Sequence, residues 1–359
     1  MPRIDIPLGL GSYESKALPF SAQRCVNFYG LVAQAESISD YGLFPTPGIV
    51  QLGTAGTMES RGARTMAGVY YVVNDTTLYE VSELGVATSR GTIAGTARVS
   101  MADNGDKLCI VVPGGNAYVY TASTTTLVQI TDPDYTTSDT VSFKDGYYIF
   151  TETDGTNWFV SALNDPTDID PLDFGSAELD PDKIICSHVT YDEVIIFGER
   201  TAEVFRNVGG SGFPFERIQG ASLEKGCNAK YSPIQWDNDT YFVGGGTNEK
   251  TGIFRISGGI ARRISTDAIE QEIQNYSSTE VSNSFSFSFS SEGAQFVGFT
   301  FRSINIDSKT FIYNASASDL AGRKVWHEQQ SGITDNSWRI NSVNTAYDKF
   351  IVSDQTDGS

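Results

Sequence analysis

The stretch Thr140–Val160, TVSFKDGYYIFTETDGTNWFV, contains the pattern that decides the fold. Apolar and polar residues alternate around Asp145-Gly146, and a second turn signal, Asp154-Gly155, follows. Alternation with a period of two is typical of a strand with one buried face. Asp-Gly between two such runs is a strong hairpin signal, because both turn positions favour positive φ. The stretch therefore predicts consecutive antiparallel hairpins.

The same pattern recurs along most of the chain. Each unit has an alternating strand, a turn rich in Asp, Asn and Gly, a second strand, a short loop and a third strand. The units start near Arg64, Arg98, Thr140, Lys183, Ser232 and Ser284, and a seventh begins near Ile340 and is cut short at Ser359. The starts lie roughly 34 to 56 residues apart, which is the spacing of propeller blades. Each small sheet must stack on its neighbours to bury its faces.

We therefore predict an all-β fold, a β-propeller-like array of six or seven antiparallel blades with an extended N-terminal arm and one short helix. The arm covers residues 1–59 and the propeller domain covers residues 60–359, with its last blade incomplete. A sandwich or two smaller sheets stay as alternatives, because the repeat is degenerate.

The arm lacks a clean period and is rich in proline, which suits an extended segment lying on a scaffold. Four of its aromatic residues are candidates for contact with a neighbouring subunit: Tyr13, Phe20, Phe28 and Tyr29. Alternatively, these aromatic residues pack on the blades of their own chain, and this second interpretation is the preferred one.

A single helix is expected at about Thr266 to Tyr276. Asp267 is the expected cap of its first turn, with Glu270 three residues on. Ile269, Ile273 and Tyr276 would share one face, which should pack across the edge of a blade.

The composition disfavours tight nucleic-acid binding. The net charge is −19, whereas such binding draws its affinity from Lys and Arg that neutralise phosphates. The charge suits a surface that DNA passes without sticking, or it only keeps the protein soluble. The four cysteines show no zinc-ligand spacing. Cys109 and Cys186 lie in apolar runs, where a thiol acts as a small core hydrophobe, and this weakly suggests a reducing cytoplasm. The first residues predict no signal peptide, and no apolar run is long enough to serve as a membrane anchor.

No motif points to catalysis, a metal or a cofactor. The two histidines, His188 and His327, have no nearby nucleophile motif, so hydrogen bonding in the core or an interface is expected. The acidic stretch Asp165 to Asp173 could hold calcium, but it lacks the EF-hand offsets, and a solvated loop between blades is the preferred reading. The segment Thr151 to Trp158 is similar to a sialidase Asp-box hairpin but departs from its spacing and occurs once.

Several short segments of the chain match one known protein family, and they occur in the same order as in that family. They are Val26-Asn27-Phe28, Phe44 to Ile49, Ser60-Arg61-Gly62, Gly95 to Ala102, Pro181 to Phe205, and Ala268 to Tyr276 with Glu280. On these residues the chain resembles the packaged-DNA stabilisation proteins of short-tailed bacteriophages, which are also called tail hub or nozzle proteins. The chain stops short of typical members, which leaves open whether it is truncated and puts a distal domain in doubt.

This resemblance implies a structural virion tail protein and no enzyme. It implies a homo-hexamer below the portal adaptor that retains packaged DNA and carries a tail needle or plug and tail fibres or spikes. Such a protein would be assembled in the host cytoplasm, and genomic DNA would pass it without tight binding. The alternative is a carbohydrate-binding or glycan-cleaving propeller, which would need accessible carboxylates and aromatic rings at the propeller mouth.

Overall fold

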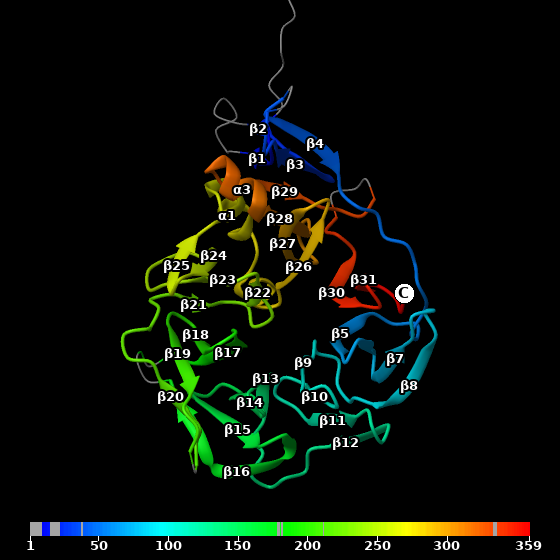
Figure 1. Ribbon diagram of the computed structural model, residues 1–359, viewed down its shortest axis with the longest axis vertical. Helices are drawn as coiled ribbons and strands as arrows, with labels where there is room; N and C mark the ends of the chain where they lie inside the picture. The colour runs from blue at the N-terminus through cyan, green and yellow to red at the C-terminus, as the bar shows by residue number, and fades with distance from the viewer. Residues whose placement is uncertain are drawn as a thin grey trace, which may run out of the picture.

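The computed structural model describes residues 9–14, 22–36, 39–177, 180, 182–210, 212–332 and 336–359. Small antiparallel sheets follow one another around a central axis (Figure 1). The first strand of most sheets lies toward the axis, next to the inner strands of the neighbouring sheets, and in blade 5 this place is taken by β22. The last strand of each sheet lies toward the rim. The predicted all-β propeller is confirmed.

The first three blades are four-stranded sheets, each with its strands in sequence order. Blade 1 contains β5 (Ser60–Met66), β6 (Val69–Asn74), β7 (Thr77–Val81) and β8 (Ala87–Thr92). Blade 2 contains β9 (Ser100–Asp103), β10 (Lys107–Val111), β11 (Ala117–Thr121) and β12 (Thr126–Gln129). Blade 3 contains β13 (Ser138–Lys144), β14 (Tyr147–Glu152), β15 (Asn157–Ala162) and β16 (Asp165–Ser176).

The next three blades complete most of the ring. Blade 4 contains β17 (Ile184–Val189), β18 (Val194–Gly198), β19 (Ala202–Asn207) and β20 (Phe215–Arg217). Blade 5 contains β21 (Gly226–Cys227), β22 (Ile234–Trp236), β23 (Asp239–Gly245), β24 (Gly252–Ser257) and β25 (Ile260–Arg263). Blade 6 contains β26 (Phe285–Ser291), β27 (Ala294–Phe301), β28 (Lys309–Asn314) and β29 (Trp326–Glu328).

A two-stranded hairpin occupies the seventh sector of the ring. Its strands are β30 (Ile340–Ala346) and β31 (Lys349–Asp354). Strand β30 lies between β26 of blade 6 and β5 of blade 1. The ring therefore has six full blades and a seventh sector with only two strands.

The arm forms two short hairpins and an extended segment. The hairpins pair β1 (Tyr13–Glu14) with β2 (Ala22–Gln23), and β3 (Phe28–Val32) with β4 (Tyr41–Pro45). Both lie outside blade 6 (Figure 1). Residues 25–27 bond to the outer edge of β29, since the backbone N–H of Asn27 donates to Glu328 and that of Glu328 donates to Cys25. The domain boundary at residue 59 stays a prediction.

The described residues form three helices where the sequence predicted one. They are α1 (Asp267–Ile273), α2 (Ser278–Ser282) and α3 (Ala315–Ala321). The predicted cap was wrong, because Thr266 and not Asp267 is the N-cap of α1 and its side chain accepts from the backbone of Ile269. The apolar face is as expected: Ile269, Ile273 and Tyr276 are buried between blades 5 and 6.

The acidic stretch from Asp165 to Asp173 also differs from its prediction. It is not a loop between blades but part of β16, the outer strand of blade 3. Asp165 bonds to Lys107 of blade 2, with 3.0 Å between the carboxylate oxygen and Nζ. Among the described residues, no group of three acidic, histidine or cysteine side chains is placed to hold a metal ion.

The core consists of layers between neighbouring sheets. Tyr71 and Val73 of blade 1 pack with Leu108 and Ile110 of blade 2, and comparable clusters fill the other gaps. On the other side of blade 1, Tyr70 and its neighbours pack on the β30–β31 hairpin. Each sheet is therefore buried only because the next one covers it.

Candidate functional site

The structure separates the four aromatic residues predicted as subunit contacts. Phe28 is 47% exposed and Tyr29, the next residue in β3, is 2% exposed. Tyr29 packs edge-on against Phe296 of blade 6, with 4.9 Å between the ring centroids. Its ring is thus covered by its own chain. Tyr13 is half-buried in β1, and Phe20 lies outside the described residues.

A second exposed feature of the arm is the strap, which we define as residues 47–52. The strap runs along the rim from the β3–β4 hairpin toward blade 1 (Figure 1). All six of its residues are exposed, including Ile49 at 48% and Val50 at 90%. Residues 41–58 carry no charged side chain, in a chain with a net charge of −19. An uncharged, exposed run of this kind is typical of an interaction surface.

The central channel has a mouth, which we define as the end where the innermost strands begin. Arg98 enters it from blade 2 just before β9 and reaches Asn341 of the seventh sector. Its two guanidinium Nη atoms donate to the side-chain and backbone oxygens of Asn341 at 2.6 and 2.8 Å. The hydroxyl of Tyr231, from blade 5, donates to the backbone carbonyl of Arg98 at 2.5 Å. These residues come from blades that do not adjoin, so their contacts cross the axis.

Arg302, which follows β27 of blade 6, completes this arrangement. It donates to the Asn341 side chain at 3.1 Å and to the carbonyl of Ile340 at 2.7 Å. The Arg98 and Arg302 guanidinium carbons lie 4.3 and 5.0 Å from the centroid of the Phe285 ring. The Asn341 amide in turn donates to the backbone carbonyl of Ser60 in blade 1. Asn341 thus joins the seventh sector to blades 1, 2 and 6.

Arg61 lies beside these groups at the start of β5. Its Nε donates to the carbonyl of Ala97 at 2.7 Å, and its Nη1 donates to the carbonyls of Asp75 and Ile93. We call Arg61, Arg98 and Arg302 the arginine cluster. None of the three has a carboxylate within ion-pairing distance in the described part of the chain.

The surroundings of the arginine cluster disfavour its positive charges. Desolvation lowers the pKa of Arg98 to about 10. Desolvation together with repulsion from Arg98 lowers the pKa of Arg302 to about 10. Burial also lowers the pKa of Arg61. All three remain charged at neutral pH, so the mouth carries cations inside an acidic protein.

One further bond crosses the axis at the same end. Lys230 of blade 5 pairs with Asp139 of blade 3 at 2.8 Å. Together with the bonds of Arg98 to Asn341 and of Tyr231 to Arg98, this pair joins side chains of non-adjacent sectors across the mouth.

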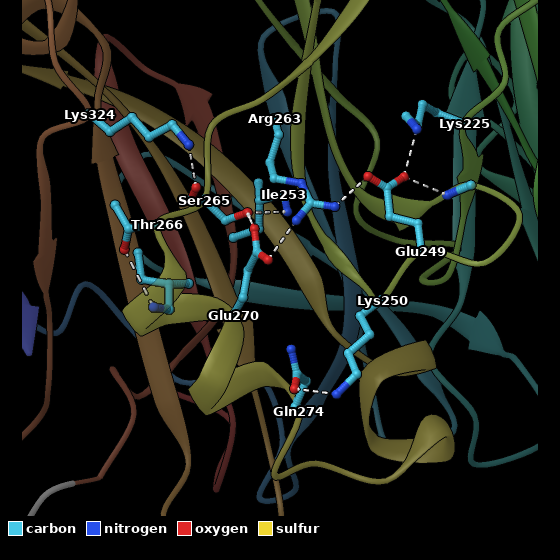
Figure 2. Close-up of polar contacts among 12 residues, drawn as sticks. Lys225, Glu249, Lys250, Ile253, Arg263, Ser265, Thr266, Glu270, Gln274 and Lys324 are labelled. Atoms are coloured by element: carbon cyan, nitrogen blue, oxygen red, sulfur yellow. Dashed lines mark hydrogen bonds and ion pairs between the residues drawn. The ribbon is translucent and has the colours of Figure 1, made fainter. Parts of the chain in front are cut away.

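A polar network fastens α1 to blade 5 (Figure 2). Arg263, at the end of β25, bonds to the carboxylates of both Glu249 and Glu270. Glu270 also accepts from the Ser265 hydroxyl at 2.6 Å, and Glu249 accepts from Lys225 at 2.6 Å. Glu270 is thus used by Arg263 and Ser265 and does not form the expected capping box. That motif occurs in α2, between Ser277 and Glu280.

His327 is buried and His188 is half-buried, and neither ring has an ionic partner among the described residues. Desolvation lowers the pKa of His188 to about 4 and that of His327 to about 3. Neither ring nitrogen of His327 has a hydrogen-bond partner, and its ring lies near Tyr29 and Phe296. Both histidines are therefore neutral at pH 7.

A cavity of about 480 Å³ lies between the arm, α1 and blade 6. Carboxylates of Glu14, Glu272 and Asp307 line it, but the nearby Trp326 ring is 1% exposed. A fourth carboxylate, Glu328, is held by Arg24 at 2.8 Å. This cavity is at the rim and offers no free indole face on which a sugar could stack.

Sequence reasoning missed the arginine cluster and Asn341. Arg61 and Arg98 fall inside segments that carry the family resemblance, Ser60-Arg61-Gly62 and Gly95 to Ala102, and this was the only available signal. Their convergence depends on how the ring closes, which no local pattern reports.

Two solved structures have a similar fold. The extracellular domain of the putative one component system BT4673 from B. thetaiotaomicron matches with a TM-score of 0.52 and 11% identity, over 86% of this chain and 39% of that chain. The computationally designed Ika8 protein matches with a TM-score of 0.50 and 13% identity, over 92% of both chains. At these identities the likeness concerns the fold alone. No helix of the described part is long and apolar enough to cross a membrane.

The sequence comparisons are more specific. The chain is 25% identical over 266 residues to the tail hub protein gp10 of Salmonella phage P22, which covers 69% of this chain and 54% of gp10. The chain thus spans about half the length of this curated relative. The family model described as bacteriophage P22 Gp10, beta-propeller, matches residues 4–359. This match covers all six blades, the seventh sector and most of the arm, and the chain belongs to the P22 Gp10 β-propeller family.

Proposed function

We propose that this protein is a non-enzymatic structural component of a phage tail hub, located in the virion tail. It forms a homo-hexamer that docks on the portal adaptor. The hexamer closes the channel, retains packaged DNA and carries a tail needle or plug and tail fibres or spikes. The observation that carries the proposal is the family match over residues 4–359 of a propeller.

The bonds across the mouth support an architectural role. Side chains of opposite blades are bonded to one another there, so each propeller is a rigid body whose rim and loops are free to make contacts. DNA would then pass through the lumen of a ring of copies and not through any single propeller. The acidic composition supports passage without adsorption, because a surface rich in carboxylates repels phosphates.

For contact between copies we propose the strap and the adjacent Phe28. Closed rings need an interface of substantial area with apolar residues at its centre. The strap offers exposed apolar side chains without charge, which suits contact between copies that each carry −19. The four cysteines are free and buried, which supports assembly in the reducing host cytoplasm.

The test uses packaged heads that lack this protein. Adding the purified chain should protect their DNA from nuclease and place six copies on each head, counted by cryo-electron microscopy. Val50→Asp should reduce occupancy because it puts a charge in the proposed contact, whereas Leu172→Asp, at an exposed position in β16 of blade 3, should not.

The outcomes separate the parts of the proposal. Heads that leak DNA despite full occupancy would refute DNA retention. Single bound copies would refute the ring, and equal effects of the two substitutions would remove the strap from the interface.

A further inference from the structure

The arginine cluster has no negative partner of its own. Elsewhere in the described structure most basic residues do have one: Arg64, on the same strand as Arg61, lies 2.8 Å from a carboxylate oxygen of Asp103. Asp75 acts on Arg61, and Glu59 and Asp354 act on Arg302, only from beyond ion-pairing distance. In an acidic chain the lack of an ion pair at the cluster therefore needs an explanation. Buried charges are generally paired, because removing an isolated charge from water is costly.

The cluster also has unused hydrogen-bond donors. A guanidinium has five N–H donors, and the oxygens that accept from these three arginines are all neutral carbonyl or amide oxygens. The Nη2 of Arg61 and the Nε of Arg302 are buried and have no hydrogen-bond partner among the described residues. Arg61 is only 4% exposed. Such donors point to an acceptor that sits between the arginines.

The three arginines lie close together although they come from three blades. Arg61 bonds to the residue before Arg98, and Arg98 and Arg302 share both Asn341 and the Phe285 ring. Gly95 borders the cluster, and a Cβ at this position would lie 3.5 Å from the free Nη2 of Arg61. Gly95 thus adds no side chain next to the unused donor.

We propose that the mouth binds one free inorganic phosphate ion between Arg61, Arg98 and Arg302. Phosphate offers several acceptor oxygens, and planar guanidinium groups recognise it with paired N–H donors. The depth of Arg61 favours a small ion over a phosphate of a nucleic-acid strand, which could not follow its phosphate into the mouth. The bound ion would link blades 1, 2 and 6 next to Asn341 and so stabilise the closure of the ring.

Binding is tested first on the unaltered 359-residue chain. Inorganic phosphate should raise the melting temperature saturably when compared with chloride at equal ionic strength, because a ligand of the folded state stabilises it. The ³¹P signal of phosphate should broaden in the presence of the protein. A 5′-phosphorylated oligonucleotide should produce neither effect.

Substitutions then locate the ion. Arg302→Gln should weaken phosphate binding about tenfold or more, since a charge-assisted pair of donors is lost. Arg302→Lys keeps the positive charge but lacks the paired N–H donors of the guanidinium, and it should weaken phosphate binding less than Arg302→Gln. Arg64→Gln is the matched control from the exposed Arg64–Asp103 pair and should leave binding unchanged.

Three results would overturn the proposal. One is a melting temperature and a ³¹P linewidth of the unaltered chain that do not distinguish phosphate from chloride. Another is an Arg64→Gln protein that loses binding as much as Arg302→Gln, which would indicate general charge. The third is an oligonucleotide that competes with phosphate, which would point to a nucleic-acid phosphate. The wild-type measurements decide the matter even if Arg302→Gln does not fold.

Discussion

Asn341 is the residue at which the first, second and sixth blades meet the seventh sector. Its side-chain oxygen accepts from two arginines, and its amide donates to blade 1. No neighbouring group replaces the Asn341 side-chain oxygen as an acceptor, because no described carboxylate lies within ion-pairing distance of Arg98 or Arg302. The stability of the ring therefore depends on one uncharged side chain.

Asn341→Ala should lower the free energy of unfolding by about 2 to 4 kcal/mol, because it leaves two desolvated guanidinium groups with fewer acceptors. Asn344→Ala is the matched control on the same strand, since the Asn344 amide has no partner. Urea unfolding of both proteins gives the comparison. Equal losses would mean that the bonds of Asn341 do not hold the ring closed.

The β30–β31 turn contains two non-glycine residues with positive φ, Tyr347 at 55° and Asp348 at 56°. The Tyr347 hydroxyl donates to the carbonyl of Val81 at 2.7 Å, so this residue has a role in packing. Asp348 is exposed. Asp348→Gly should stabilise the protein by about 0.5 to 1 kcal/mol, because glycine accepts this conformation without strain. Asp348→Ala should destabilise it, and thermal unfolding that ranks the two the other way would contradict the argument.

The two histidines set a pH dependence. Their folded-state pKa values, about 4 for His188 and about 3 for His327, lie below the unfolded value near 6.5. The unfolded chain thus binds more protons below pH 6.5, and stability falls as the pH drops from there toward the folded values, by up to about 1.4 kcal/mol per pH unit per histidine. His327→Phe should make the fall between pH 6.5 and pH 5 shallower. Urea unfolding across this range would contradict the assignment if the slope were unchanged.

At the scale of elements, α1 is held to blade 5 by a chain of charges and not by helix propensity. It has seven residues, too few to be stable alone. Arg263 joins its Glu270 to Glu249 of blade 5 (Figure 2). Loss of this network should release the helix from the groove between blades 5 and 6 while the blades stay folded.

Glu270→Ala should cost about 1 to 3 kcal/mol, because Glu270 is buried and its removal leaves the Arg263 charge and the Ser265 hydroxyl with fewer partners. Hydrogen exchange in residues 267–273 should accelerate. Lys250→Ala, which removes an exposed bond to Gln274, is the control and should change little. The idea fails if both substitutions leave exchange in α1 unchanged.

The elements differ in how far the sequence predicts them. Asp145-Gly146 was read as a hairpin turn, and both residues have positive φ in the structure, at 50° and 92°. The first three strands of most blades follow from such signals. The outer fourth strands do not, because they lie at the rim, where only one side is covered and alternation weakens. Strand β16, with its aspartates and prolines, has the composition of a loop and is a strand because β15 pairs with it.

At the scale of the whole molecule, family resemblance and repeat spacing together predicted the propeller. They did not predict which residues meet where the ring closes. The contact between Arg98 and Asn341 spans 243 positions in the sequence. No window of local pattern contains both residues. The exposure of the strap was not predicted either, because an extended segment rich in proline does not indicate which of its side chains are buried and which are exposed.

Removal of residues 336–359 should abolish the single cooperative thermal transition, because it uncovers β5 and β26 and the cluster around Tyr70. Removal of residues 355–359 alone loses the bond between Ala55 and Gly358 and should have a much smaller effect. Calorimetry of the two proteins gives the comparison. A cooperative transition in the larger deletion would show that six blades close without the hairpin.

The bonds that cross the axis also make the two faces of the propeller differ in their resistance to deformation. Among the described residues, the hydrogen bonds and ion pairs that join non-adjacent sectors lie at the mouth: Arg98 with Asn341, Tyr231 with Arg98, and Lys230 with Asp139. Toward the opposite face the sheets are joined only to their neighbours, as in the pair of Lys107 with Asp165. Under load the ring should therefore splay from the opposite face while the mouth acts as its pivot, and a partner that pulls on that face would meet the softer side.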